Sequence, residues 1–78
     1  MNSIGIDVGK KICRASIKDQ HGIILDELSF SNDAAGIGSF LSAVSRYGDA
    51  RAVVESTGNM WMRIHDTLED HGIETVLA

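Results

Sequence analysis

The sequence predicts an α/β fold in which a mixed five-stranded sheet packs against two helices. Several short stretches carry an apolar residue at every second position, which is typical of half-buried strands. Other stretches carry apolar residues three or four positions apart, which is typical of amphipathic helices. In chain order these stretches give β-β-β-α-β-α-β, which predicts an antiparallel meander followed by parallel strands reached through helical crossovers.

The first three strands are expected to follow one another through short turns. The first strand ends at Asp7, and Gly9 can adopt the positive φ that a tight turn needs. Residues 19–22 have the composition of a hairpin turn. Cys13, the only cysteine, lies in the alternating second strand and is expected to be a small core side chain. The three strands are predicted over residues 3–7, 12–18 and 23–30.

The first helix is expected to follow the third strand. Ser31, Asn32 and Asp33 are all residue types that cap helices, and Gly48 is placed to end the helix. Residues 50–55 form a compact apolar run that predicts a fourth, buried strand. The apolar residues that share the inner face of the helix are Ile37, Phe40, Leu41, Val44 and Tyr47.

The second helix is expected to begin near Gly58 and to stop at Gly72. Ser56 and Thr57 are tempting nucleophiles, but directly after a buried strand they are better explained as caps of this helix. A fifth strand is predicted over residues 73–77. The inner face of the helix is expected to hold Met60 or Trp61, Ile64 and Leu68.

Length and composition indicate one small globular unit, since the 78 residues include 44% hydrophobic side chains and no proline. A chain of this size has room for one core, so its stability on its own should be marginal. The apolar runs are far shorter than the ~20 residues of a membrane span, and the first residues lack the basic start of a secretion signal. We therefore expect a cytoplasmic protein without membrane contact.

The net charge of −4 argues against a protein that holds nucleic acid by its overall charge. The basic residues are concentrated between Lys10 and Lys18, whereas the second half is acidic. This stretch is either a solvated hairpin edge, which is the simpler interpretation, or a local contact for phosphate groups. The residues that would make such a contact are Lys10, Lys11 and Arg14.

Two carboxylates form the main functional signal, because Asp7 ends the first predicted strand and Glu55 ends the fourth. The predicted order of elements is the layout of the ribonuclease H-like fold, in which these two strands lie side by side and parallel. Both carboxylates would then lie at the carboxyl edge of the sheet, where ligand sites gather. Such a pair can bind magnesium for phosphodiester chemistry. Alternatively, Asp7 supports a turn and Glu55 caps a helix or forms a salt bridge.

Residues 4–11, IGIDVGKK, resemble the opening motif of DEDD-type insertion-sequence transposases, whose RuvC-like domain works with a structured guide RNA. Residues 53–58, VVESTG, together with the helix of Trp61 and the segment 71–76, are similar to the second motif of that group. The resemblance covers nearly the whole chain. It implies that Asp7 and Glu55 are the first two catalytic ligands of Mg²⁺ or Mn²⁺ and that DNA is the substrate.

In that family the third and fourth acidic ligands, and a separate domain with a serine nucleophile, come after the segment that this sequence covers. The resemblance therefore implies that residues 1–78 form one partial RuvC-like domain, which binds metal weakly and is inactive by itself. The histidines at positions 21, 65 and 71 do not share one face and predict no metal site.

Two other functions remain open from the sequence. Residues 5–9, GIDVG, also resemble the first phosphate loop of actin-like ATPases and sugar kinases, although lysines follow where that loop usually has serine or threonine. The chain could instead be a non-catalytic remnant or regulator that dimerises through a strand edge. A homodimer would be expected to bury Phe40, Tyr47 or Trp61 between its subunits.

Overall fold

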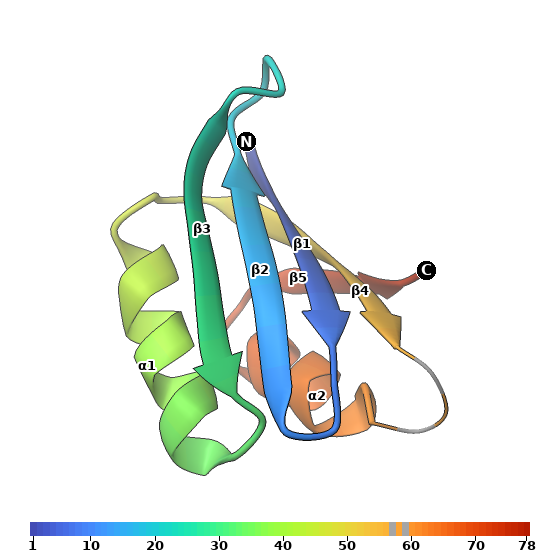
Figure 1. The fold of residues 1–78 in the computed structure, drawn as a ribbon. Helices are drawn as coiled ribbons and strands as arrows, with labels where there is room; N and C mark the ends of the chain where they lie inside the picture. The colour runs from blue at the N-terminus through green and yellow to red at the C-terminus, as the bar shows by residue number, and fades with distance from the viewer. Residues whose placement is uncertain (57, 59) are drawn as a thin grey trace.

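The computed structural model describes residues 1–56, 58 and 60–78. It contains one five-stranded sheet with the strand order β3-β2-β1-β4-β5 (Figure 1). Strands β1, β2 and β3 form an antiparallel meander, whereas β4 is parallel to both β1 and β5. The predicted order of elements and the ribonuclease H-like layout are therefore confirmed. The elements are β1 (Asn2–Val8), β2 (Ile12–Lys18), β3 (Ile24–Ser31), α1 (Ala34–Ser45), β4 (Ala50–Ser56), α2 (Met62–Asp70) and β5 (Glu74–Leu77).

Both helices pack on the same face of the sheet, where their apolar residues and those of the strands form one core. Phe40 of α1 stacks on Phe30 of β3 with 4.4 Å between ring centroids. Cys13 is fully buried in this core, as expected. The opposite face, which we call the open face, is covered by none of the described elements. The central residues of the buried face are Ile4, Ile6, Val8, Ala15, Ile17, Ala52 and Val54 from the strands, and Ile37, Val44, Ile64 and Leu68 from the helices.

The expected burial of the aromatic residues needs correction. Phe40 is only 2% exposed within the chain, so it is not available to a dimer interface. Tyr47 and Trp61 pack against the core while remaining partly exposed. Of the two alternatives for the start of the inner face, Trp61 packs against the core, whereas Met60 is 39% exposed and precedes α2. Among the described residues, no helix is long and apolar enough to cross a membrane.

The hairpin between β2 and β3 differs by one residue from the prediction. The Asp19 carboxylate accepts hydrogen bonds from the backbone N–H groups of His21 and Ile23, at 2.8 and 3.0 Å. The Asp19 N–H in turn donates to the carbonyl of Ile23. Because these bonds hold Ile23 in the turn, β3 begins at Ile24 and extends to Ser31. The hairpin projects beyond the rest of the sheet (Figure 1).

The second helix begins later than predicted. Gly58 has a φ of +69°, which a right-handed helix cannot contain, so the helix does not start there. Helix α2 begins at Met62, and its N-cap residue Trp61 makes no side-chain capping hydrogen bond. The capping roles expected for Thr57 and for the side chain of Ser56 fall outside the described part of the chain.

The start of α1 lies tightly against the end of β3. Of the three candidate caps, Asp33 takes the role and accepts a hydrogen bond from the Gly36 N–H at 2.7 Å. The hydroxyl of Ser31 donates to the same carboxylate oxygen at 2.9 Å. A methyl group at Gly36 would overlap the backbone carbonyl and the hydroxyl of Ser31. The contact between the strand end and the helix therefore requires glycine at this position.

A pair of glycine substitutions in α1 tests this close approach. Gly36→Ala should destabilise the protein by about 1–3 kcal/mol or more, because the backbone of Ser31 must move to make room. Gly38→Ala is the matched control, since a methyl group there meets no atom within 4 Å. It should stabilise the helix by roughly 0.5–1 kcal/mol. Urea unfolding of both variants measures the difference, and equal effects would contradict the packing described.

The cap also predicts a pH dependence. The hydrogen bonds from Gly36 and Ser31 hold the pKa of Asp33 below its ordinary value of 3.8. A carboxyl whose pKa is lowered by folding contributes stability above its unfolded-state pKa, and this contribution is lost as the pH falls through the folded-state value. Asp33→Asn keeps a capping side chain that does not titrate. Unfolding measured across acidic pH should therefore show a steeper loss of stability in the wild type than in Asp33→Asn; parallel curves would refute this role.

Candidate metal centre

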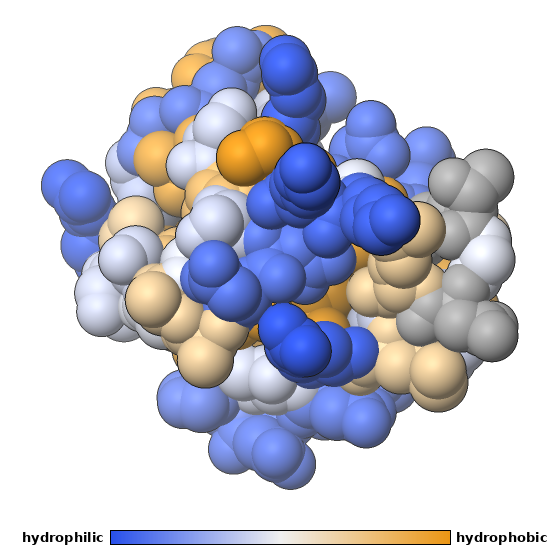
Figure 2. All heavy atoms as spheres, turned by 60° about the horizontal axis from the view of Figure 1, so that its bottom comes forward, coloured by the Kyte–Doolittle hydropathy of each residue, from blue (hydrophilic) through white to orange (hydrophobic). Residues whose placement is uncertain are grey.

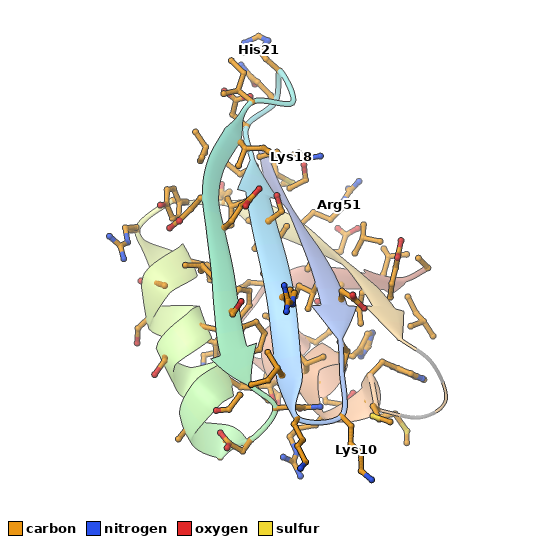
Figure 3. The ribbon with its side chains drawn as sticks, viewed as in Figure 1. Lys10, Lys18, His21 and Arg51 are labelled. Carbon is orange, nitrogen blue, oxygen red and sulfur yellow. The ribbon has the colours of Figure 1, made fainter. Side chains whose placement is uncertain are left out.

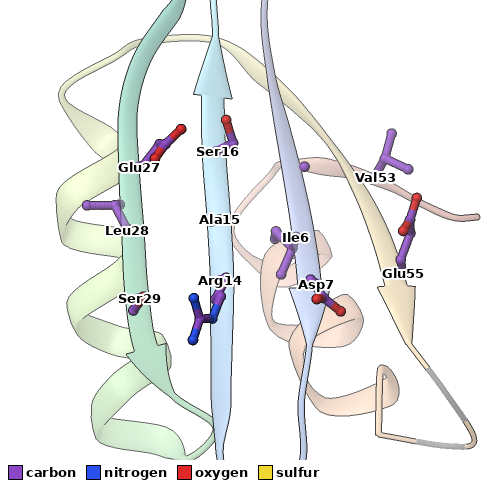
Figure 4. Close-up of a pocket in the computed structure, with 11 residues that line it drawn as sticks. Ile6, Asp7, Arg14, Ala15, Ser16, Glu27, Leu28, Ser29, Val53 and Glu55 are labelled. Atoms are coloured by element: carbon purple, nitrogen blue, oxygen red, sulfur yellow. The ribbon is translucent and has the colours of Figure 1, made fainter.

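The two predicted carboxylates lie side by side. Asp7 of β1 is the direct partner of Glu55 of β4 in the parallel register. Adjacent strands are about 4.8 Å apart, and partners in register project to the same face. Both side chains are exposed on the open face, near the carboxyl ends of their strands (Figure 4). The structure therefore brings together the pair that the sequence singled out.

The alternation of each strand explains this placement. On β1, Ile6 and Val8 point into the core, so Asp7 between them must point to the open face. On β4, Val54 is fully buried and Glu55 follows it with the opposite orientation. The same apolar residues that anchor the strands thus fix the direction of both carboxylates.

Asp7 and Glu55 line a groove on the open face with a volume of about 680 Å³. Arg14 of β2 is the register partner of Asp7, and Ser29 of β3 is the partner of Arg14. Together these four residues form a row across four strands. Figure 4 shows Arg14 leaning toward β3 rather than toward Asp7. Glu27, a third carboxylate of the groove, lies two residues before Ser29 on β3.

The electrostatics of the row suit a cation. Like charges directly opposite one another on adjacent strands destabilise a sheet. In the described part of the chain, the ion pairs are those of Arg51 with Glu74 and His65 with Asp66, so neither Asp7 nor Glu55 has a basic partner within 4.0 Å. Magnesium ions commonly use one or two protein carboxylates and keep several waters, which an exposed groove permits.

The donor set fits such an ion only in part. Within residues 1–56, 58 and 60–78, no group of three or more His, Cys, Asp or Glu residues is arranged to hold a metal. Asp7 and Glu55 would thus supply two ligands, and water or other groups would have to supply the remainder. The thiol of Cys13 is no ligand for this site because it faces the core, where burial raises its pKa.

The basic residues of the β1–β2 region do not form one patch. Lys10 and Lys11 lie in the turn at the same end of the sheet as Asp7, whereas Lys18 lies at the opposite end (Figure 3). Arg14 projects from the open face between them. Of the basic residues between Lys10 and Lys18, the two turn lysines and Arg14 therefore lie toward the end of the sheet that holds the carboxylates, and Lys18 does not.

Sequence reasoning missed a residue that holds this turn in place. The side-chain amide of Asn32 donates to the carbonyl of Gly9 at 2.9 Å, and its backbone N–H donates to the carbonyl of Lys11 at 2.8 Å. Asn32 was one of three candidate helix caps, and only one residue can take that role. A polar residue next to the true cap was the available signal, but its partners are more than 20 positions away.

Comparison with known proteins agrees with this fold. The chain is similar to a ROK family glucokinase from Streptomyces griseus, with 20% identity, a TM-score of 0.64, and coverage of 99% of this chain and 32% of the kinase. The Lmo2764 protein of Listeria monocytogenes, a candidate N-acetylmannosamine kinase, gives 15% identity and a TM-score of 0.63, with coverage of 99% and 34%. Our chain thus spans about a third of either protein, and identities this low indicate a shared fold alone.

The family comparison is more specific. No curated protein matches the chain. A family model for DEDD transposases of the IS110 type, described as a transposase, matches residues 4–78. The match includes Asp7, Glu55 and every element between β1 and β4. This chain therefore belongs to the IS110 family of DEDD transposases.

Proposed function

We propose that this chain provides the first two acidic ligands of a metal-dependent centre for DNA strand cleavage and transfer. The observation that carries the proposal is the register of Asp7 with Glu55 on the open face. Membership in a transposase family supports DNA as the substrate class. The resemblance noted in the sequence adds a structured guide RNA as a partner of the whole enzyme.

Asp7 and Glu55 would act as oxygen ligands that fix the position of Mg²⁺ or Mn²⁺ at the end of the sheet. When bound, such an ion activates a water or hydroxyl for attack on a phosphodiester and stabilises the leaving oxygen. Arg14 would hold the DNA backbone beside the carboxylates, and the turn residues Lys10 and Lys11 would extend this contact. A fixed row of opposite charges orients a phosphate more strongly than a flexible surface does.

The proposal assigns only part of a catalytic centre to residues 1–78. In the family that the motifs resemble, two further acidic ligands and a serine nucleophile complete the site. Two carboxylates give an ion less charge and less geometric definition than a complete set. We therefore expect weak metal binding by this chain.

Metal titration tests the two-carboxylate site directly. Addition of Mg²⁺ or Mn²⁺ should change the backbone amide NMR signals of Asp7 and Glu55 and their neighbours. Asp7→Asn and Glu55→Gln should each abolish these changes, because either substitution leaves a single charged ligand. Glu27→Gln is the matched control, since it removes a carboxylate from the same groove without touching the pair. Changes spread equally over surface acids, or lost equally in Glu27→Gln, would contradict the assignment.

The incomplete donor set predicts no measurable nuclease activity from the 78-residue chain alone. The assay is cleavage of supercoiled plasmid in Mg²⁺ and in Mn²⁺, with Asp7→Asn as the control for contaminating nucleases. Cleavage by the wild type that disappears in Asp7→Asn would show that the site is complete, and this expectation would be wrong.

A further inference from the structure

We propose that Lys10, Lys11 and Arg63 form a single contact surface for the phosphate backbone of a nucleic acid. We call these three residues the basic cluster. It lies at the end of the sheet that holds Asp7 and Glu55. The proposal rests on the proposed function for the class of partner, and it adds a residue from the acidic half of the sequence and a defined location.

Hydrogen bonds join the three segments that carry the cluster. Asn32, between β3 and α1, binds the β1–β2 turn through the carbonyls of Gly9 and Lys11. Its own carbonyl accepts a hydrogen bond from Nη1 of Arg63 at 3.4 Å. The guanidinium of Arg63, on the first turn of α2, and the backbone carbonyl of Lys11 therefore bind the same residue, Asn32. Residues that are distant in sequence thus meet around one asparagine.

The turn that carries the lysines is held in one shape. A methyl group at Gly9 would overlap the carbonyl of Ile12, so the turn is closed as tightly as glycine allows. Asn32 fixes it from outside by its two bonds. Because the backbone is held, only the side chains of Lys10 and Lys11 must become ordered when a ligand binds, which lowers the entropy lost on binding.

The charges of the cluster are available to a ligand. The two ion pairs in the described part of the chain involve neither Lys10, Lys11 nor Arg63. Arg63 contributes to the lowered pKa of Asp33, whose carboxylate accepts hydrogen bonds from Gly36 and Ser31. Figure 2 shows this end of the molecule, where strongly hydrophilic side chains gather. All three basic residues are exposed there.

The chemistry of the cluster favours a backbone over bases. Lysine and arginine contacts to phosphate position a nucleic acid without reading its sequence, and their strength depends on salt. The turn begins two residues after Asp7, so the cluster and the carboxylate pair lie at the same end of the sheet. A protein with a net charge of −4 needs such a local surface, because its overall field repels polyanions.

The test is the salt dependence of binding, measured by fluorescence anisotropy of the whole chain without divalent metal. Lys10→Gln, Lys11→Gln and Arg63→Gln should each reduce the slope of log affinity against log salt by about 1. Lys18→Gln and Arg46→Gln are matched controls, because they remove the same charges from the opposite end of the sheet and from the end of α1. Both controls should keep the wild-type slope.

Arg63→Lys separates charge from structure, since Arg63 also donates to Asn32. It should restore most of the slope lost in Arg63→Gln. Equal losses in all five glutamine variants would mean diffuse attraction and would overturn the proposal, as would an Arg63→Gln variant that matches the controls. Absence of binding to any probe would also overturn it.

Two sources can supply the phosphate backbone, so duplex DNA and a structured RNA of equal phosphate number are tested in parallel. If the cluster variants reduce the salt slope with DNA, the substrate strand binds to the cluster. If they reduce it with RNA alone, the guide binds there. Either outcome supports the surface. Because no divalent metal is present, the readout does not require Asp7 or Glu55 to act as metal ligands. A failed metal titration would therefore leave this result interpretable.

Discussion

The parallel pairing of β1 with β4 joins the two halves of the sheet, and the other features of the molecule depend on it. Seven consecutive residue pairs connect these strands across nearly 50 positions of sequence. Strands β2 and β3 lie on one side of the pair and β5 on the other. The same pairing closes the core, through Ile6 beside Val54, and sets Asp7 beside Glu55 on the open face. Folding and site assembly therefore depend on one set of hydrogen bonds.

This arrangement has an electrostatic cost that a purely structural protein would avoid. Two adjacent carboxylates on neighbouring strands repel each other, and the apolar residues beneath them prevent either from turning away. Sites that oppose local stability in this way are commonly functional. The turn held by Asn32 adds positive charge at the same end of the sheet without neutralising the pair. Attraction for a cation and attraction for a polyanion can thus coexist within one small region.

Much of the fold could be predicted because its patterns are local. Alternation revealed the strands, and the order of elements was enough to predict that Asp7 lies near Glu55. The start of α2 could not be predicted, since the positive φ of Gly58 is a property of the folded chain. The bonds of Asn32 to Gly9 and from Arg63 were equally inaccessible, because they join segments that no periodicity relates. The roles of these side chains follow from their positions in the folded chain rather than from their residue types.

The separation of the two faces by the pleat has a consequence for how this domain can vary. Substitutions on the open face leave the core intact, so the charges around the carboxylates can change one at a time. An insertion or deletion of a single residue within β1 would disrupt the core, because it would turn Asp7 inward and expose Ile6 or Val8 to water. Length changes should therefore accumulate in the hairpin beyond Lys18, whereas β1 and β4 should keep their residue spacing even in relatives whose sequences have otherwise diverged.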